Sequence, residues 1–255
     1  MDKTKKRNIG ILGTGHIGKT LARKLAEAGH DVKVANSRGP ETIEPDVLAF
    51  GARAVTTAEA VQDVDVVIVS IPLNRLSGLA PLIAGLPAGT VVVDTSNYYP
   101  VRDGKIDALD AGQVESLWVA EQLGHTVVKA WNAIGSDSLA RKGMPAGSPG
   151  RIAIPVAADA EADRKVGMAL VEDTGFDAFD AGTLADSWRQ QPGAPAYCTD
   201  LTKEEMPAAL AAAERARLPK RRDLAFAAVM ERLEGTTATN PDAEYGVRLS
   251  RALYM

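Results

Sequence analysis

A glycine-rich turn between an apolar run and a helical pattern is the feature that most constrains how this chain can fold. The run Ile9 to Leu12 is short and apolar, as in a buried strand, and the turn that follows reads Gly13-Thr14-Gly15-His16-Ile17-Gly18. Apolar residues then recur every three to four positions as far as Gly29, which predicts an amphipathic helix that ends at a left-handed glycine. A second apolar run at 31–35 completes the order strand, turn, helix, strand.

This order is the context in which the spacing G-x-G-x-x-G indicates a dinucleotide site rather than an ordinary glycine turn. In such a turn the first glycine permits the sharp bend, the second lets the backbone approach a pyrophosphate, and the third lets the helix pack on the strand. The unpaired N–H groups at the helix start would hold the phosphates. The predicted cofactor-binding residues of this turn are Gly13, Thr14, Gly15, His16, Ile17 and Gly18.

The end of the second predicted strand indicates which dinucleotide is bound. NAD sites usually place an acidic residue there to bind the ribose 2′-hydroxyl, whereas this chain has Asn36-Ser37-Arg38 and no acid before Glu41. A hydroxyl and a guanidinium would bind a 2′-phosphate through charge-assisted hydrogen bonds, and Thr14 could lie beside the same group. We therefore predict NADP as the cofactor, with a solvated surface role for Arg38 as the alternative.

Strand and helix patterns alternate along most of the chain. Short apolar, β-branched runs predict strands at 52–55, 64–70, 90–94, 126–131, 151–157 and 176–180, and helical patterns lie at 41–50, 57–62, 73–84, 111–123 and 160–173. This alternation predicts an α/β fold with a doubly wound, mostly parallel Rossmann sheet. Beyond residue 182 only helical patterns remain, at 203–217 and 220–234. We predict an NADP-binding domain over 1–182 and a C-terminal helical extension, 183–255, for substrate binding or dimerisation.

Ligands of such sheets bind outside the carboxyl ends of the strands, so the loops there supply the candidate site. The further cofactor-binding candidates are Ser70, Ile71, Pro72, Thr95, Asn97 and Ala133. Asn132 is the catalytic candidate that could hydrogen-bond the nicotinamide amide or the acceptor carbonyl; alternatively, it ties down its loop. Trp131, Tyr98, Tyr99 and Trp188 could stack on a planar ring or belong to the core. Arg189 could bind an acidic substrate group or be a surface cation.

Composition limits the partners. The chain has 255 residues, 45% of them hydrophobic and 24% charged, as in an ordinary globular protein. Its net charge of −4 gives no reason to expect nucleic acid or an anionic membrane as a partner. A single cysteine suits a reducing cytoplasm, and three scattered histidines predict no metal site. No apolar run reaches the length of a membrane span. The apolar stripe of Phe226, Met230 and Leu233 predicts core packing or a homodimer.

Several stretches resemble the F420-dependent NADP reductases, whose relatives include the reductase domains of membrane ferric reductases. They are the glycine turn, Asn36 to Arg38, the run 65–72 (DVVIVSIP), and the segment 154–184, which ends in Asp180-Ala181-Gly182 and Thr183-Leu184. The resemblance implies an enzyme that passes hydride between NADP(H) and a second flat redox partner, the deazaflavin coenzyme F420. It also implies that Ser70 to Pro72 border the cofactor and that residues 132–135 lie beside the nicotinamide.

Two alternatives to a deazaflavin-type reductase stay open from the sequence. Members of that family often carry His and Pro where this chain has Asn132 and Gly135, so the acceptor side differs more than the NADP side. One alternative is an NADPH-dependent reductase of a small C=O or C=N substrate, of the hydroxyacid, imine or pyrroline carboxylate kind. The other is a non-catalytic NADPH-sensing module, which would have a closed acceptor side.

Overall fold

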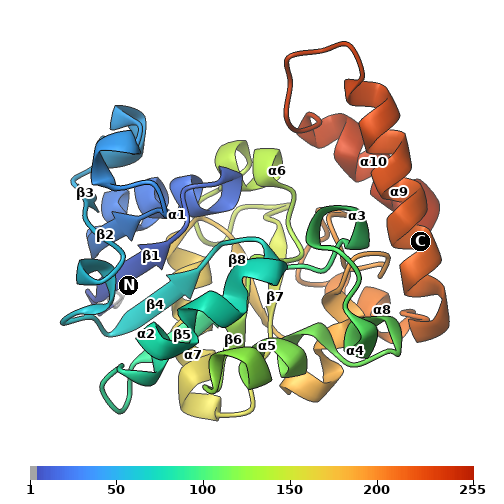
Figure 1. Ribbon diagram of the computed structural model, residues 1–255. Helices are drawn as coiled ribbons and strands as arrows, with labels where there is room; N and C mark the ends of the chain where they lie inside the picture. The colour runs from blue at the N-terminus through green and yellow to red at the C-terminus, as the bar shows by residue number, and fades with distance from the viewer. Residues whose placement is uncertain (1–4) are drawn as a thin grey trace.

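A parallel sheet with helices on both faces forms the body of the protein. The computed structural model describes residues 5–255 (Figure 1). Its six strands lie in the order β3-β2-β1-β4-β5-β6, which is the strand order of a Rossmann fold. The order reverses between β1 and β4, so their carboxyl ends open the crevice where such folds bind ligands. The strands are β1 (Asn8–Leu12), β2 (Asp31–Ala35), β3 (Arg53–Ala54), β4 (Val66–Val69), β5 (Val91–Asp94) and β6 (Val128–Lys129).

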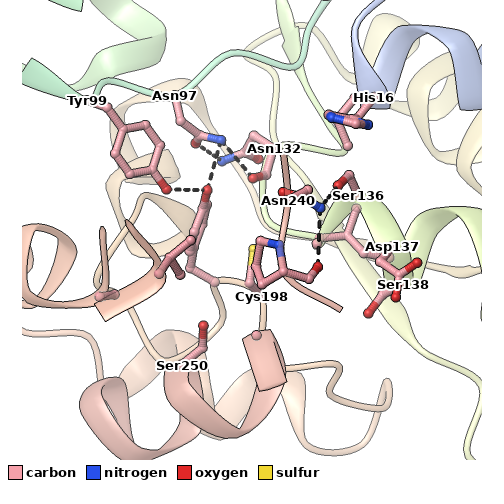
Figure 2. A pocket seen from close by; sticks show the side chains of 18 of the residues that line it. His16, Asn97, Tyr99, Asn132, Ser136, Asp137, Ser138, Cys198, Asn240 and Ser250 are labelled. Carbon is pink, nitrogen blue, oxygen red and sulfur yellow. Dashed lines mark hydrogen bonds between the residues drawn. The ribbon is translucent and has the colours of Figure 1, made fainter. Parts of the chain in front are cut away.

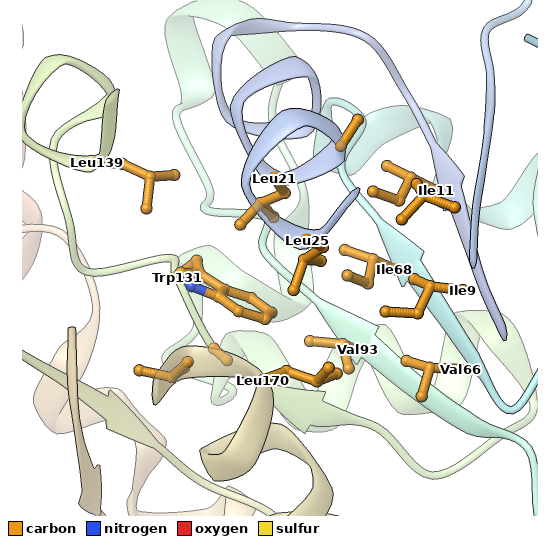
Figure 3. Packing of buried hydrophobic residues seen from close by; sticks show 14 of the residues in the cluster. Ile9, Ile11, Leu21, Leu25, Val66, Ile68, Val93, Trp131, Leu139 and Leu170 are labelled. Atoms are coloured by element: carbon orange, nitrogen blue, oxygen red, sulfur yellow. The ribbon is translucent and has the colours of Figure 1, made fainter. Parts of the chain in front are cut away.

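The two faces of the sheet bury alternate residues of the same strands. Val66 and Ile68 of β4 pack on one side with α1 (His16–Glu27) and α7 (Glu161–Asp173), as Figure 3 shows for Leu21, Leu25 and Leu170. Val67 and Val69 pack on the other side with α5 (Glu115–Leu123). Both faces of the sheet are covered, which explains why its central strands are unbroken β-branched runs in the sequence. The predicted doubly wound sheet is confirmed.

The last two predicted strands form a sheet of their own. β7 (Ala153–Val156) and β8 (Asp177–Asp180) pair in parallel with each other, and only an isolated antiparallel bridge from Ala157 to Lys129 joins them to β6. The Lys129 N–H donates to the Ala157 carbonyl oxygen at 2.8 Å. The alternation of strands and helices in the sequence would place β7 beside β6 in one sheet. The main sheet instead ends at β6.

Several predicted helices are shorter than expected or are 3₁₀ turns. The remaining α-helices of the first part are α2 (Ala80–Ala84), α3 (Pro100–Asp103), α4 (Asp107–Asp110) and α6 (Ser136–Arg141). The 3₁₀ segments are Pro40–Thr42, Pro45–Leu48, Glu59–Val61, Leu73–Leu79, Leu184–Gln190 and Arg215–Arg217. Apolar spacing alone does not distinguish such short turns from one or two turns of α-helix.

Three α-helices lie within residues 183–255. They are α8 (Met206–Ala211), α9 (Leu218–Leu233) and α10 (Ala243–Tyr254). The helix expected over 203–217 starts late because Pro207 lacks an N–H and lies in the first turn of α8. α9 and α10 pack side by side beyond the carboxyl edge of the sheet (Figure 1). Leu224 and Met230 of α9 are 50% and 52% exposed, and the homodimer stays a prediction. No helix within 5–255 is both long and apolar enough to cross a membrane.

Candidate functional site

The glycine turn divides into two packed positions and one open position. A Cβ on Gly13 would lie 2.1 Å from the Ser70 carbonyl oxygen, and one on Gly18 would lie 2.0 Å from the Gly13 carbonyl oxygen. Gly13 also has a φ of +113°, which side chains rarely adopt. A Cβ on Gly15 would meet no atom within 4 Å. The protein itself therefore requires glycine at 13 and 18, whereas Gly15 borders open space of the kind a pyrophosphate would fill.

The loop after β2 holds its shape through Asn36 and leaves its other polar groups free. The Asn36 side chain donates to Thr14 Oγ1 at 3.3 Å and to Thr42 Oγ1 at 2.9 Å, and its Oδ1 accepts from the Arg38 N–H at 2.8 Å. Ser37 and Arg38 are exposed, and Arg38 forms no ion pair with any residue in the described range 5–255. Both side chains are thus available to an anion beside the glycine turn.

A cavity of about 530 Å³ lies beyond the carboxyl ends of the central strands. The sheet side of the cavity is formed by the glycine turn and by the loops that follow β4, β5 and β6. Its outer wall consists of α9 and α10. The predicted cofactor and site residues that line it are Gly15, His16, Ile17, Ser70, Ile71, Pro72, Thr95, Asn97, Trp131 and Asn132. The structure therefore brings loops from four strands together at one cavity, the size of which is typical of a ligand site.

Asn132 lies at the cavity wall, but its amide is fully used by the protein (Figure 2). Its Nδ2 donates to Asn97 Oδ1 at 3.1 Å and to the Gln190 carbonyl at 2.9 Å, and its Oδ1 accepts from Gln190 Nε2 at 2.9 Å. The residue is 2% exposed. Of the two roles that the sequence left open, this geometry favours the anchoring of its loop over contact with a substrate.

Five predicted site residues have side chains that are buried or that lie outside the cavity. The Trp131 ring is fully buried beside Leu21 and Leu25 (Figure 3), and its Nε1 donates to Thr174 Oγ1 at 3.3 Å. Tyr98 is 2% exposed and its hydroxyl bonds to Asp110 and Gly104. Ala133 is 6% exposed and does not line the cavity. Trp188 and Arg189 stack on each other at 4.4 Å outside the cavity. The side chains of Trp131, Tyr98, Trp188 and Arg189 are therefore not placed to contact the reacting groups, contrary to the prediction from the sequence.

Two tyrosines, Tyr99 and Tyr197, line the cavity. The hydroxyl groups of Tyr99 and Tyr197 are 2.8 Å apart, and Tyr197 Oη also accepts from Asn97 Nδ2 at 3.3 Å. Figure 2 shows Tyr99 directed toward this hydrogen bond. Burial raises the pKa of both phenols above the usual value, so both stay protonated at neutral pH and can donate a hydrogen bond. The sequence did not identify Tyr197, because it lies in an irregular segment that follows no strand of the main sheet.

Buried charges support the loop that carries Asn97 and Tyr99. Lys129 Nζ lies 2.6 Å from Asp94 Oδ2, and both side chains are fully buried. Glu115 accepts from the Tyr98 N–H at 3.1 Å, and burial raises the pKa of this carboxyl to about 7. These groups lie behind the cavity wall, so their role is to position the loop.

The connection between α9 and α10 crosses the start of α1. His16 Nε2 lies 3.0 Å from Thr239 Oγ1, Asn240 Nδ2 donates to Ser136 Oγ, and the Ala243 N–H donates to Asp137 Oδ2 at 2.7 Å. The C-terminal helices are therefore anchored next to the turn in which the cofactor phosphates are expected. No three His, Cys, Asp or Glu side chains within 5–255 are grouped as a metal site would require.

Comparison with known proteins relates parts of the chain to NAD(P) oxidoreductases. Residues 8–98 match the family of coenzyme F420-dependent NADP oxidoreductases, which confirms the predicted resemblance for that segment. The protein YjhV of Escherichia coli (strain K12) is 49% identical over 80 residues, which are 30% of this chain and 58% of that protein. The NAD-dependent L-serine dehydrogenase of Pseudomonas aeruginosa is 29% identical over 182 residues, which are 69% of this chain and 54% of that enzyme.

Solved structures share the fold. The crystal structure of a hypothetical protein from Sinorhizobium meliloti is 29% identical, covers 79% of this chain and 98% of its own, and has a TM-score of 0.67. The chain spans only 30% to 58% of the length of the curated relatives that it matches.

Proposed function

We propose that this chain, whose residues 8–98 match the coenzyme F420-dependent NADP oxidoreductases, is an NADP(H)-dependent oxidoreductase. One observation carries the proposal: Gly15 and the phenols of Tyr99 and Tyr197 line the same cavity. A dinucleotide with its pyrophosphate at the start of α1 would extend along the strand ends into that cavity. A bound nicotinamide would supply the hydride, and the protein would supply binding and orientation.

The residues of the glycine turn and of the β2 loop fit this cofactor. Gly15 leaves room for the pyrophosphate, and the N–H groups at the start of α1 would bind its oxygens. Ser37 and Arg38 would bind the 2′-phosphate, for which an acid at that place would be repulsive. One similar dehydrogenase is NAD-dependent, so this loop is the argument for NADP over NAD.

The cavity favours a small acceptor over a deazaflavin. Its volume of about 530 Å³ is in the range of a single drug-sized ligand, and it has to hold the nicotinamide end together with the acceptor. α9 and α10 close its outer side, so residues 183–255 would act as the substrate segment. This arrangement supports the reduction of a small C=O or C=N substrate. A non-catalytic NADPH sensor would need no such space beside the nicotinamide.

An acceptor panel tests the proposal. Purified protein and NADPH would be mixed separately with F420, with a flavin and with small carbonyl and imine compounds, and the loss of NADPH absorbance would be followed. We expect turnover with members of the carbonyl or imine set. Turnover with F420 alone would restore the deazaflavin assignment, whereas tight NADPH binding without oxidation by any acceptor would favour the sensor.

A further inference from the structure

One arginine of the cavity wall has its ion-pair partner at the protein surface. Arg222 on α9 is 8% exposed and lines the cavity. Its Nε donates to Asp223 Oδ1 at 2.8 Å, but the Asp223 side chain is 59% exposed, so water screens this pair. The two terminal nitrogens of Arg222 have no hydrogen-bond acceptor among residues 5–255, and neither nitrogen is fully buried. Such a cation needs an anion or water in the cavity.

The second arginine of the cavity is already neutralised. Arg102 donates from Nε and Nη2 to the two carboxylate oxygens of Asp103, at 2.9 and 2.8 Å, and from Nη2 to the Asn97 carbonyl. The Asp103 side chain is fully buried and accepts two hydrogen bonds from Arg102, so this pair is bidentate even though the Arg102 side chain is 44% exposed. Arg222 is therefore the cavity-lining arginine that can offer a free guanidinium to a ligand.

Arg222 lies on the part of α9 that packs against the loop of Tyr98 and Tyr99. Its guanidinium is 5.3 Å from the ring centre of Tyr98, the residue before Tyr99. Phe226 lies one helical turn further along α9 and packs on Tyr99 with ring centres 5.7 Å apart. A cation and two phenol hydroxyls thus line the same cavity. The other lining side chains of α9 and α10 are mostly apolar, among them Val229, Met230, Leu233 and Leu249.

We propose that Arg222 binds a carboxylate of the acceptor and that Tyr99 donates its hydroxyl proton to the acceptor carbonyl, so that the substrate is an oxo acid with an apolar side chain. This assignment rests on the proposed function. The Asn97 amide donates to Tyr197 Oη, and in the arrangement that we propose Tyr197 donates to Tyr99, whose own proton is then directed to the substrate. The apolar side chain of the acid would lie against α9 and α10.

The reaction balances with the groups named. The carbonyl carbon accepts a hydride from the nicotinamide, and the C=O electron pair moves to the oxygen. That oxygen takes the Tyr99 proton, and Tyr99 recovers a proton from Tyr197, which regains one from solvent. The net change is oxo acid plus NADPH plus H⁺ to hydroxy acid plus NADP⁺. A phenol with a raised pKa can still protonate the strongly basic alkoxide that this transfer forms.

Binding of an acid that cannot be reduced tests the anion subsite without any need for turnover. Phenylacetate and its neutral counterpart phenylacetamide would be titrated calorimetrically into the full chain saturated with NADPH. We expect the acid to bind at least about tenfold more tightly, as a charge-assisted hydrogen bond requires. Arg222→Gln should abolish this preference and Arg222→Lys should keep part of it. Lys220→Gln, which removes an exposed charge of the same helix outside the cavity, should leave it unchanged.

Kinetics then test the proton donor. With phenylpyruvate and its methyl ester, Arg222→Gln should raise KM for the acid alone, and Tyr99→Phe should lower kcat by about a hundredfold or more. Equal binding of phenylacetate and phenylacetamide, or an acid preference that survives in Arg222→Gln, would overturn the anion subsite. If Arg222→Gln fails to fold, a full acid preference in a folded Arg222→Met protein does the same. The protein could bind the acid through Arg222 and yet oxidise NADPH with none of the acceptors. This result would contradict the proposed function but would support the anion subsite.

Discussion

Replacement of Gly15 by alanine separates binding of the cofactor from stability of the fold. In the structure a methyl group at this position meets no protein atom within 4 Å, and the φ of −69° and ψ of −175° suit alanine. Gly15 is the N-cap of α1, where alanine is less favourable than glycine by up to about 1 kcal/mol. The lower entropy of the unfolded chain offsets about 0.4–1 kcal/mol of this cost. We therefore expect the free energy of unfolding to change by less than about 1 kcal/mol.

The same methyl group would occupy the space in which we place the pyrophosphate. We expect the dissociation constant for NADPH, measured by fluorescence titration, to rise at least about tenfold. Urea unfolding would verify that stability is preserved. Gly78→Ala is the matched control, because its added methyl also meets no atom within 4 Å and lies outside the cavity. A Gly15→Ala protein that binds NADPH as tightly as the parent would refute the assignment of this turn to the phosphates.

Three further perturbations probe the ribose loop and the buried charges. Arg38→Asp should weaken NADPH binding at least about tenfold with little loss for NADH; equal losses for both cofactors would contradict the 2′-phosphate assignment. Lys129→Met should lower the free energy of unfolding, measured with urea, by about 3–5 kcal/mol, because it leaves the Asp94 carboxylate buried without its partner. The additional change Asp94→Asn should recover part of the lost stability. A loss smaller than this for Lys129→Met would mean that the pair is not buried as described. The pKa of Glu115 is raised by burial to about 7, so the folded state holds this proton more tightly than the unfolded chain. The stability that Glu115 contributes is full below about pH 4.5 and falls as the pH rises to about 7. Glu115→Gln should therefore weaken the dependence of the free energy of unfolding on pH in this range. An unchanged dependence would assign it to other groups.

The fold was largely predictable because its determinants are local. The glycine turn, the helix that ends at Gly29 and the buried β-branched runs each occupy a few consecutive residues, and the observed elements follow them. Gly29 has the expected positive φ of 93°. The separate sheet of β7 and β8 could not be anticipated. It depends on the pairing of Lys129 with Ala157, which strand patterns do not encode.

The cofactor half of the site was more predictable than the acceptor half. Strand-end loops converge in any parallel sheet, and this rule placed Gly15, Ser70 and Asn97 at one cavity. Tyr197 and Arg222 come from segments with no such rule. The stripe that contains Phe226 was visible in the sequence, but its partner could not be identified, since an apolar helix face looks the same whether it covers a core, a second subunit or a ligand cavity.

The central claim is that one NADPH molecule spans from the loop after β2 to the cavity beneath α9 and α10. A crystal structure of the NADPH complex tests it most directly. We predict the 2′-phosphate against Ser37 and Arg38, the pyrophosphate at Gly15, and the nicotinamide in the cavity next to Tyr99. A nicotinamide that lies outside this cavity, or a 2′-phosphate without contact to Arg38, would contradict the account.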